Sequence, residues 1–127
     1  MRIFKTKSFV RFADHAGIND TALCDAILRA EKGMIDADLG GGVIKQRIAR
    51  KGQGKSGGFR SIVLFREGDR SFFVYGFAKS SQSNIRKDEL KAFRMLALEM
   101  LGLNDTALGA AVENGTIKEV ICDGQTV

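Results

Sequence analysis

Apolar residues recur at helical spacing in two early segments of the chain. Residues 8–16 carry them at i, i+3, i+4 and i+7, which predicts a helix that Gly17 ends. Residues 21–32 carry a second apolar stripe, with Asn19 or Asp20 as its N-cap and Gly33 at its end. A short strand is expected before them, at residues 2–6, and the two helices are expected to form a hairpin.

Strand-like patterns follow a glycine-rich loop at residues 38–42. Three strands are predicted, at residues 43–50, 59–67 and 71–79, and Gly68-Asp69 predicts a two-residue turn between the last two. Helices at 87–101 and 106–112 and a strand at 116–121 complete the pattern. The order βααβββ followed by helices predicts an α+β fold with a mainly antiparallel sheet. The 127 residues suit a single domain, 1–127, with a C-terminal extension from about residue 103.

Strand alternation and hairpin register group the cations of the predicted strands in two pairs. Lys45 and Arg47 are two residues apart, so they project from the same face, about 7 Å from each other. A two-residue turn at 68–69 sets Arg60 opposite Phe77, with Lys79 diagonal to Arg60 on that face. The apolar residues expected behind them are Ile62, Leu64, Phe73 and Tyr75. The pattern therefore predicts a cationic site at the rim of the sheet.

The positive charge of the chain is concentrated in one stretch. The net charge is +5, from 20 Lys and Arg residues against 15 Asp and Glu residues. Residues 39–66 contain no acidic residue and seven basic ones, namely Lys45, Arg47, Arg50, Lys51, Lys55, Arg60 and Arg66. A local excess of this kind favours a polyanionic partner, and a solvated basic face is the alternative.

Other residue classes exclude several kinds of site. Cys24 and Cys122 are too few for a disulfide framework and lack metal-ligand spacing, so we expect two small buried residues in a reducing cytosol. The N-terminal segment has no long apolar run, which is unlike a signal peptide or membrane anchor, and a soluble cytoplasmic protein is expected. No carboxylate pair stands near the basic stretch, so neither a metal nor a cofactor is expected.

The basic stretch has the side chains that RNA cleavage requires. When a ribose 2′-hydroxyl attacks the adjacent phosphate, negative charge develops on the phosphate oxygens, and guanidinium and ammonium groups stabilise it. His15 is the only histidine and lies far from the stretch in sequence, which excludes a two-histidine ribonuclease arrangement. We expect His15 to be a surface residue at a helix end.

Three segments of the chain resemble the RelE/HigB-like toxins of bacterial toxin–antitoxin pairs. They are Lys45-Gln-Arg-Ile-Ala, Lys55-Ser-Gly-Gly-Phe-Arg and Phe72-Phe-Val-Tyr-Gly-Phe-Ala-Lys. Their order, with the helices around them, extends the resemblance over about residues 1–121. The resemblance implies a RelE-like fold and a metal-independent endoribonuclease that cuts mRNA on the ribosome. It also implies a cognate antitoxin, with the ribosome and mRNA as further partners.

The resemblance also implies roles for individual residues. The family's active-site cations fall by position on Lys45, Arg47, Arg60 and Lys79. Further residues expected to contact RNA are Arg50, Lys51, Lys55, Phe59 and Phe77. Some family members have a tyrosine near the position of Ile85; here Phe59 and Phe77 are the candidates for its role.

Two other functions fit the same pattern. One is a gyrase-inhibiting toxin of the related ParE branch, which does not need a cation cluster at the sheet rim. The other is a non-catalytic RNA-binding module that uses the basic stretch for phosphates alone. The cation set favours RNA cleavage. Codon preference, the antitoxin's identity and the oligomeric state do not follow from the sequence.

Overall fold

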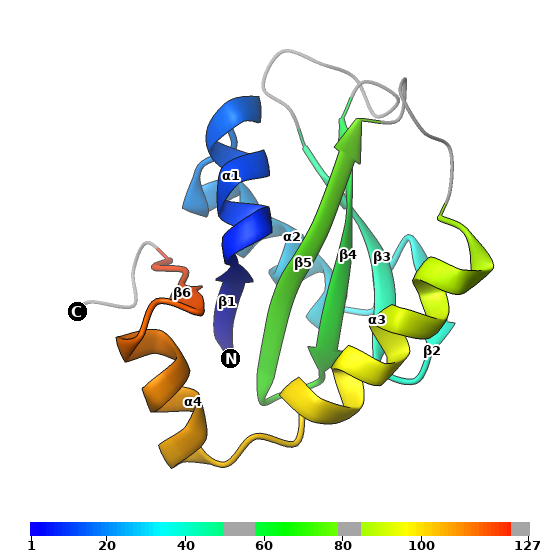
Figure 1. Cartoon of the computed structure of the whole chain (residues 1–127). Helices are drawn as coiled ribbons and strands as arrows, with labels where there is room; N and C mark the ends of the chain where they lie inside the picture. The colour runs from blue at the N-terminus through cyan, green and yellow to red at the C-terminus, as the bar shows by residue number, and fades with distance from the viewer. Residues whose placement is uncertain (50–57, 79–84, 123–127) are drawn as a thin grey trace.

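A computed structural model describes residues 1–49, 58–78 and 85–122, and it arranges them as a six-stranded sheet with helices on both faces (Figure 1). The strand order is β2-β3-β4-β5-β1-β6. The strands are β1 (Arg2–Thr6), β2 (Ala37–Gly40), β3 (Val43–Ile48), β4 (Phe59–Arg66), β5 (Arg70–Ala78) and β6 (Ile117–Glu119). Strands β1 and β5 pair in parallel and the other neighbours pair antiparallel. The expected α+β fold with a mainly antiparallel sheet is confirmed.

The four helices lie close to their predicted positions because each has a clear start and stop signal. They are α1 (Lys7–Ala16), α2 (Asp20–Glu31), α3 (Lys87–Met100) and α4 (Asp105–Glu113). Gly17 ends α1 in the left-handed conformation, with φ of 72°. Asn19 caps α2 through a bond from the backbone N–H of Ala22, at 3.0 Å. No single described helix is long and apolar enough to span a membrane; α3 and α4 pass that test only together, across a 112° bend.

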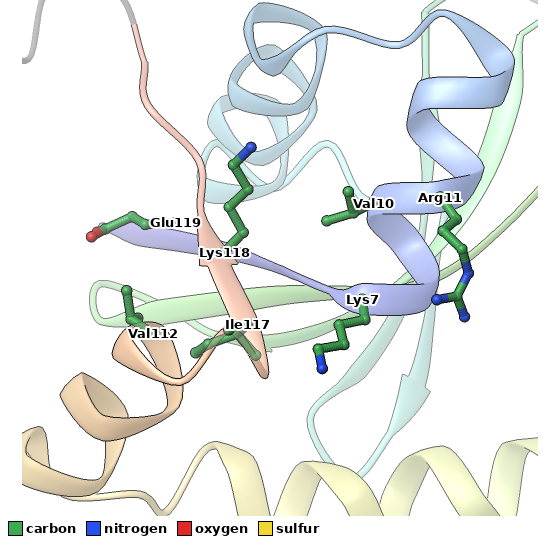
Figure 2. A pocket seen from close by; sticks show the side chains of 8 residues that line it. Lys7, Val10, Arg11, Val112, Ile117, Lys118 and Glu119 are labelled. Carbon is green, nitrogen blue, oxygen red and sulfur yellow. The ribbon is translucent and has the colours of Figure 1, made fainter.

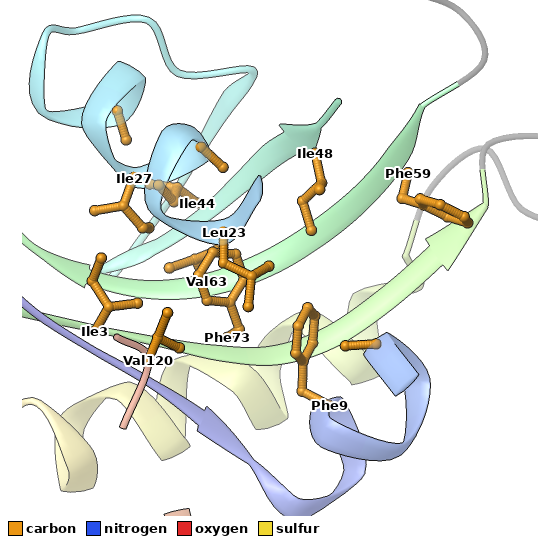
Figure 3. Close-up of a cluster of buried hydrophobic side chains, with 13 residues drawn as sticks. Ile3, Phe9, Leu23, Ile27, Ile44, Ile48, Phe59, Val63, Phe73 and Val120 are labelled. Carbon is orange, nitrogen blue, oxygen red and sulfur yellow. The ribbon is translucent and has the colours of Figure 1, made fainter. Parts of the chain in front are cut away.

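The two faces of the sheet carry separate cores. One packs against α1 and α2 and includes Phe9, Leu23, Ile27, Val63 and Phe73 (Figure 3). The other packs against α3 and α4 and includes Phe4, Ile62, Leu64, Phe72, Ala97 and Leu108. Side chains from both faces of β3, β4 and β5 are therefore buried.

The hairpin β4–β5 differs from its predicted geometry at two places. Arg66 pairs with Arg70, so the turn contains three residues rather than two. Ile62 pairs with Tyr75, whereas Val63 pairs with Phe73, so a β-bulge adds one residue to β5 between these two pairs. The two deviations cancel, so Arg60 does pair with Phe77 as predicted. Phe73, expected on the cation face, lies instead in the core under α1 and α2 because the bulge reverses its side.

The glycine-rich segment predicted as a loop contains a strand. Residues Ala37–Gly40 form β2 and pair with β3. The glycines at 40, 41 and 42 have φ of 83°, 64° and 83°, which allows the tight turn between β2 and β3. The guanidinium of Arg94 on α3 donates to the carbonyl of Leu39 at 3.1 Å and fixes this hairpin.

The expectation of two free, buried cysteines is wrong. Cys24 on α2 and Cys122 after β6 form a disulfide, and both residues are only partly buried. The bond joins positions 98 residues apart, so it ties the end of the described chain to the N-terminal helices. Sequence spacing cannot reveal such a pair, because β6 must first pair with β1 to bring Cys122 beside α2.

Candidate cationic site

The candidate site lies on the α3 side of the sheet, at the ends of β3, β4 and β5 opposite the β4–β5 turn. Alternate residues of β3 face opposite sides: Ile44 and Ile48 enter the core under α1 and α2, and Val43 enters the core under α3. Lys45 and Arg47 therefore project on the α3 side. Figure 1 shows α3 crossing the half of the sheet nearer the β4–β5 turn, which leaves the site end beyond it.

Strand register arranges the site residues in two rows across the sheet. Arg47 pairs with Arg60, and Arg60 pairs with Phe77. In the next row Lys45 pairs with Ile62, and Ile62 pairs with Tyr75. Directly paired residues on one face have Cβ atoms about 5 Å apart. Three cations and two aromatic rings are thus brought together by backbone pairing alone.

The aromatic side of the site is continuous with α3. The ring of Tyr75 lies 5.9 Å from that of Phe77 and 5.9 Å from that of Phe93 on α3. Phe77 is buried, with 4% exposed, whereas Tyr75 is partly exposed. Such tilted ring pairs are favourable beyond their burial and hold the helix against this end of the sheet.

One carboxylate that the sequence reasoning overlooked lies among the cations. The Oδ2 atom of Asp36 is 3.5 Å from Nε of Arg60 and 3.8 Å from Nζ of Lys45. The side chains of Arg60 and Lys45 are mostly buried, with 11% and 20% exposed. Asp36 stands three residues before the acid-free stretch, and only the pairing of β2 with β3 shows that it reaches Lys45 and Arg60. A strand predicted before the glycines, instead of a loop, would have placed Asp36 near Lys45 on the neighbouring strand.

The backbone at Asp36 is held by a buried amide on the other face of β3. The side chain of Gln46 is 1% exposed, and its Oε1 accepts from the backbone N–H of Asp36 at 3.1 Å. Its Nε2 donates to the carbonyls of Ala26 at 2.8 Å and Met34 at 3.0 Å. The segment that carries Asp36 is therefore anchored to α2 and β3 together.

Arg47 is packed closely at the end of β3. A Cβ atom at position 58 would lie 2.7 Å from the carbonyl oxygen of Ile48 and 3.2 Å from Nε of Arg47, which explains the glycine there. The carbonyl of Arg47 accepts from Nη2 of Arg29 on α2 at 2.8 Å. The position of Arg47 is thus set by both helix α2 and the start of β4.

The structure brings together four of the predicted site residues, Lys45, Arg47, Arg60 and Phe77. It places Phe59 on the opposite face, 8% exposed, with its ring edge-on to Phe12 of α1 at 5.7 Å. That is the position of a core residue, so Phe77 and Tyr75 are the aromatic side chains on the cation face. The other predicted positions, Arg50, Lys51, Lys55 and Lys79, lie outside the described residues.

Two further groups bear on the chemistry. His15 is exposed in the last turn of α1, the helix that covers the opposite face of the sheet from Lys45. Within residues 1–49, 58–78 and 85–122, no three His, Cys, Asp or Glu side chains gather in a way that could hold a metal ion. The described site consists of the cations Lys45, Arg47 and Arg60, the Asp36 carboxylate among them and the neighbouring aromatic rings.

A second surface also carries cations. Figure 2 shows a hollow between α1 and β6, with Val10 and Ile117 in it and Lys7, Arg11 and Lys118 around it. Its volume is about 350 Å³. Glu119 also lines it, and its carboxylate accepts from Nε and Nη2 of Arg2, at 2.9 Å each. This surface belongs to the edge strand and lies apart from the Lys45–Arg60 cluster.

Comparison with known protein families places the chain. The family model described as RelE toxin of the RelE / RelB toxin-antitoxin system matches residues 1–120. No curated protein matches the chain. The matched residues include all six described strands and all four helices.

Proposed function

Because this match covers nearly the whole chain, the protein belongs to the RelE toxin family, and we propose that it is a ribosome-dependent mRNA endoribonuclease acting in the cytoplasm. Family membership makes it the toxin of a toxin–antitoxin system, with a cognate antitoxin as partner. The observation that carries the finer proposal is the row Arg47–Arg60–Phe77 with Lys45 beside it, on the sheet end beyond α3.

The proposed reaction is an internal transfer at phosphorus. The ribose 2′-oxygen forms a bond to phosphorus, the bond to the 5′-oxygen breaks, and the products end in a 2′,3′-cyclic phosphate and a 5′-hydroxyl. The proton leaves the 2′-oxygen and one is delivered to the 5′-oxygen. Arg47, Arg60 and Lys45 would hold the phosphate and stabilise its developing charge. The partly exposed ring of Tyr75, backed by the buried ring of Phe77, would support a neighbouring base.

The ribosome has a clear physical role in this proposal. The described cations and rings lie on a sheet face, and in this proposal they act on a flexible RNA strand that the ribosome orients. A strand held in the ribosome would be presented in an ordered conformation, and orientation of reacting groups contributes strongly to rate.

The first prediction is that Arg60→Ala abolishes cleavage. The purified protein should cut mRNA on programmed ribosomes, should leave naked RNA intact, and should give 2′,3′-cyclic phosphate ends. Arg60→Ala should reduce the single-turnover rate by about 100- to 1,000-fold, the usual effect of removing one charge-stabilising donor. Its far-UV circular dichroism should match that of the unsubstituted protein.

His15→Gln is the matched control for this prediction. His15 is exposed and lies on the other face of the sheet, so its rate and pH profile should stay close to those of the unsubstituted protein. A tenfold loss, about 1.4 kcal/mol, would show that His15 takes part in the reaction, against this proposal. If the folded Arg60→Ala protein kept full activity, the cation row would not be the catalytic site. Gyrase inhibition without cleavage would favour the ParE-like function, and binding without cleavage would favour an RNA-binding module.

A further inference from the structure

We propose that the carboxylate of Asp36 stands in for an RNA phosphate: it holds Arg60 and Lys45 in place in the free protein and is displaced when a phosphodiester binds. This inference rests on the proposed function of the same site. It adds a positioning residue that also weakens the binding of RNA until the correct phosphate arrives.

The first support is geometric. A single oxygen atom of Asp36 contacts both cations, at 3.5 Å from Nε of Arg60 and 3.8 Å from Nζ of Lys45. The two cations lie on neighbouring strands, in different rows of the sheet. One anionic oxygen between an arginine and a lysine is the contact that a phosphate oxygen would make at the same place.

The second support is that Asp36 is fixed while its carboxylate remains accessible. Its backbone N–H is bonded to the buried amide of Gln46, which in turn is bonded to Ala26 and Met34. Its side chain is nevertheless 32% exposed, compared with 11% for Arg60. The carboxylate can therefore move out into solvent when a phosphate takes its place beside Arg60 and Lys45.

The third support is energetic. The Asp36 carboxylate is 32% exposed, and its oxygen lies 3.5 Å from Arg60 and 3.8 Å from Lys45, which is longer than a close charge-assisted hydrogen bond, so a phosphate oxygen that approaches more closely can replace each contact. A phosphodiester offers two oxygens to a guanidinium, and such charge-assisted pairs are stronger than single contacts. An RNA phosphate that reaches both Arg60 and Lys45 replaces both contacts of Asp36 at little cost in free energy. A phosphate that reaches only one of these cations leaves the other without an anion, so its binding costs more.

Removal of the carboxylate should therefore affect binding and catalysis in opposite directions. In Asp36→Asn the two cations lose their internal counter-charge, so RNA should bind more tightly. They also lose the contact that sets their position before reaction, so the catalytic step should slow. A residue that only supports the fold would weaken both binding and catalysis.

The experiment compares Asp36→Asn with Asp38→Asn, which removes the same charge from the same hairpin. The Asp38 carboxylate accepts from the backbone N–H of Gly40 at 3.0 Å, a bond that asparagine can keep. The probe for binding is a short 2′-O-methyl RNA, which lacks the attacking hydroxyl. The affinity of Asp36→Asn should rise about fivefold. Its salt slope, log K against log salt concentration, should steepen by about 0.7 because one more positive charge of the protein lacks an internal anion and is left for the RNA to neutralise. On programmed ribosomes its KM should fall and its kcat should drop about tenfold.

The outcomes separate this inference from the proposed function. Lys45→Ala and Arg60→Ala should each weaken binding of the probe and abolish cleavage; if neither does so, the proposed function fails. If both do so while Asp36→Asn behaves like Asp38→Asn, only the role of Asp36 is overturned. Asp36→Glu, which restores the charge on a longer side chain, should recover part of the kcat. Loss of both affinity and rate in Asp36→Asn, with a lowered melting temperature, would make Asp36 a structural residue instead.

Discussion

At the scale of single residues, the Lys5 ammonium depends on one carboxylate. The Lys5 side chain is 8% exposed, and its Nζ donates to Oδ1 of Asp20 at 2.7 Å. The other oxygen of Asp20 accepts from the backbone N–H of Ile121 at 3.1 Å. This one side chain therefore joins β1, the start of α2 and the segment after β6.

The second prediction concerns the pH dependence of this contact. Burial raises the pKa of Asp20, but the bonds from Lys5 and Ile121 and the charges of Lys5 and Lys118 outweigh it and hold that pKa below its ordinary value of 3.8. A lowered pKa in the folded state stabilises the protein above about pH 3.8, and this stabilisation is lost as the pH falls through the folded-state pKa. Asp20→Asn should therefore lower the free energy of unfolding at pH 7 by about 2 kcal/mol, less than for a fully buried pair.

Urea unfolding at pH 7 and pH 3 measures this effect. The difference between the unsubstituted protein and Asp20→Asn should shrink at pH 3. Asp25→Asn is the control, because Asp25 is 56% exposed and its pair with Arg29 contributes little. An equal loss of stability at both pH values would show that the charge of Asp20 is not the stabilising feature.

The sequence could predict individual site residues only where strand alternation applies. Parity placed Lys45 and Arg47 on one face of their strand, and counting back from the turn placed Arg60 opposite Phe77; the pairing of Arg47 with Arg60 comes from the structure. Phe59 was expected to contact RNA as a candidate for the role of a family tyrosine, but it faces the opposite side of β4 from Arg60 and packs on Phe12. Asp36 could not be found, because its contact with Arg60 depends on a hairpin that the glycine-rich segment concealed.

At the scale of elements, helix α1 contacts the sheet through a position that only glycine fits. A Cβ atom on Gly76 of β5 would lie 2.2 Å from Cε2 of Phe12. The ring of Phe12 fills the space above Gly76 and contacts the rings of Phe9 and Phe59. The close approach of α1 to β5 thus depends on the absence of a side chain at Gly76.

The third prediction compares two glycine-to-alanine substitutions. Gly76→Ala should lower the free energy of unfolding by about 1–3 kcal/mol, because the ring of Phe12 must move. Gly109→Ala should raise it by about 0.5–1 kcal/mol, because Gly109 lies in α4 with open space around its Cβ position and alanine favours the helix. Thermal unfolding of both variants measures the two shifts; shifts of the same sign would contradict this packing.

Most elements could be predicted because their signals are local. The segment Asn-Asp-Thr-Ala-Leu occurs at 19–23 and 104–108, and in both copies the asparagine accepts from the backbone N–H three residues on, at 3.0 and 2.8 Å. The parallel pairing of β1 with β5 has no such signal, since it joins segments about 68 residues apart. Strand β2 was missed because three glycines, which favour turns, occupy the end of its hairpin.

At the scale of the whole molecule, two long-range links close the fold around the sheet. Strand β6 pairs with β1, and the disulfide Cys24–Cys122 then joins the same end of the chain to α2. A cross-link that closes a loop of about 100 residues can stabilise a fold by about 4–5 kcal/mol through the unfolded state. Disulfides are uncommon in a reducing cytosol, so stability in the proposed compartment would rest on the two cores and the sheet.

Among the residues that the structure describes, cations gather on two separate surfaces that an antitoxin could meet. One is the site face with Lys45, Arg47 and Arg60, and the other is the hollow with Lys7, Arg11 and Lys118 between α1 and β6 (Figure 2). An antitoxin that covers the site face blocks the active residues directly. One that binds at the hollow would block entry to the ribosome by its bulk and leave the site cations open.

The fourth prediction is that the antitoxin neutralises the site face with an acidic segment. Opposite charges speed association at low salt, and screening acts over roughly 10 Å at 0.1 M ionic strength, so the on-rate should fall as salt rises. Removing Lys45 and Arg47 together by alanine substitution should slow association about tenfold at low salt and flatten its salt dependence.

Lys7→Ala with Arg11→Ala is the matched control, because it removes the same charge from the other surface, and its on-rate should stay within about twofold of the original. Stopped-flow association across a salt series decides between the surfaces. If the control variant is the slow one, the antitoxin binds between α1 and β6; if neither double variant changes the salt dependence, charge does not guide the partner, and exclusion from the ribosome by bulk becomes the account of inhibition.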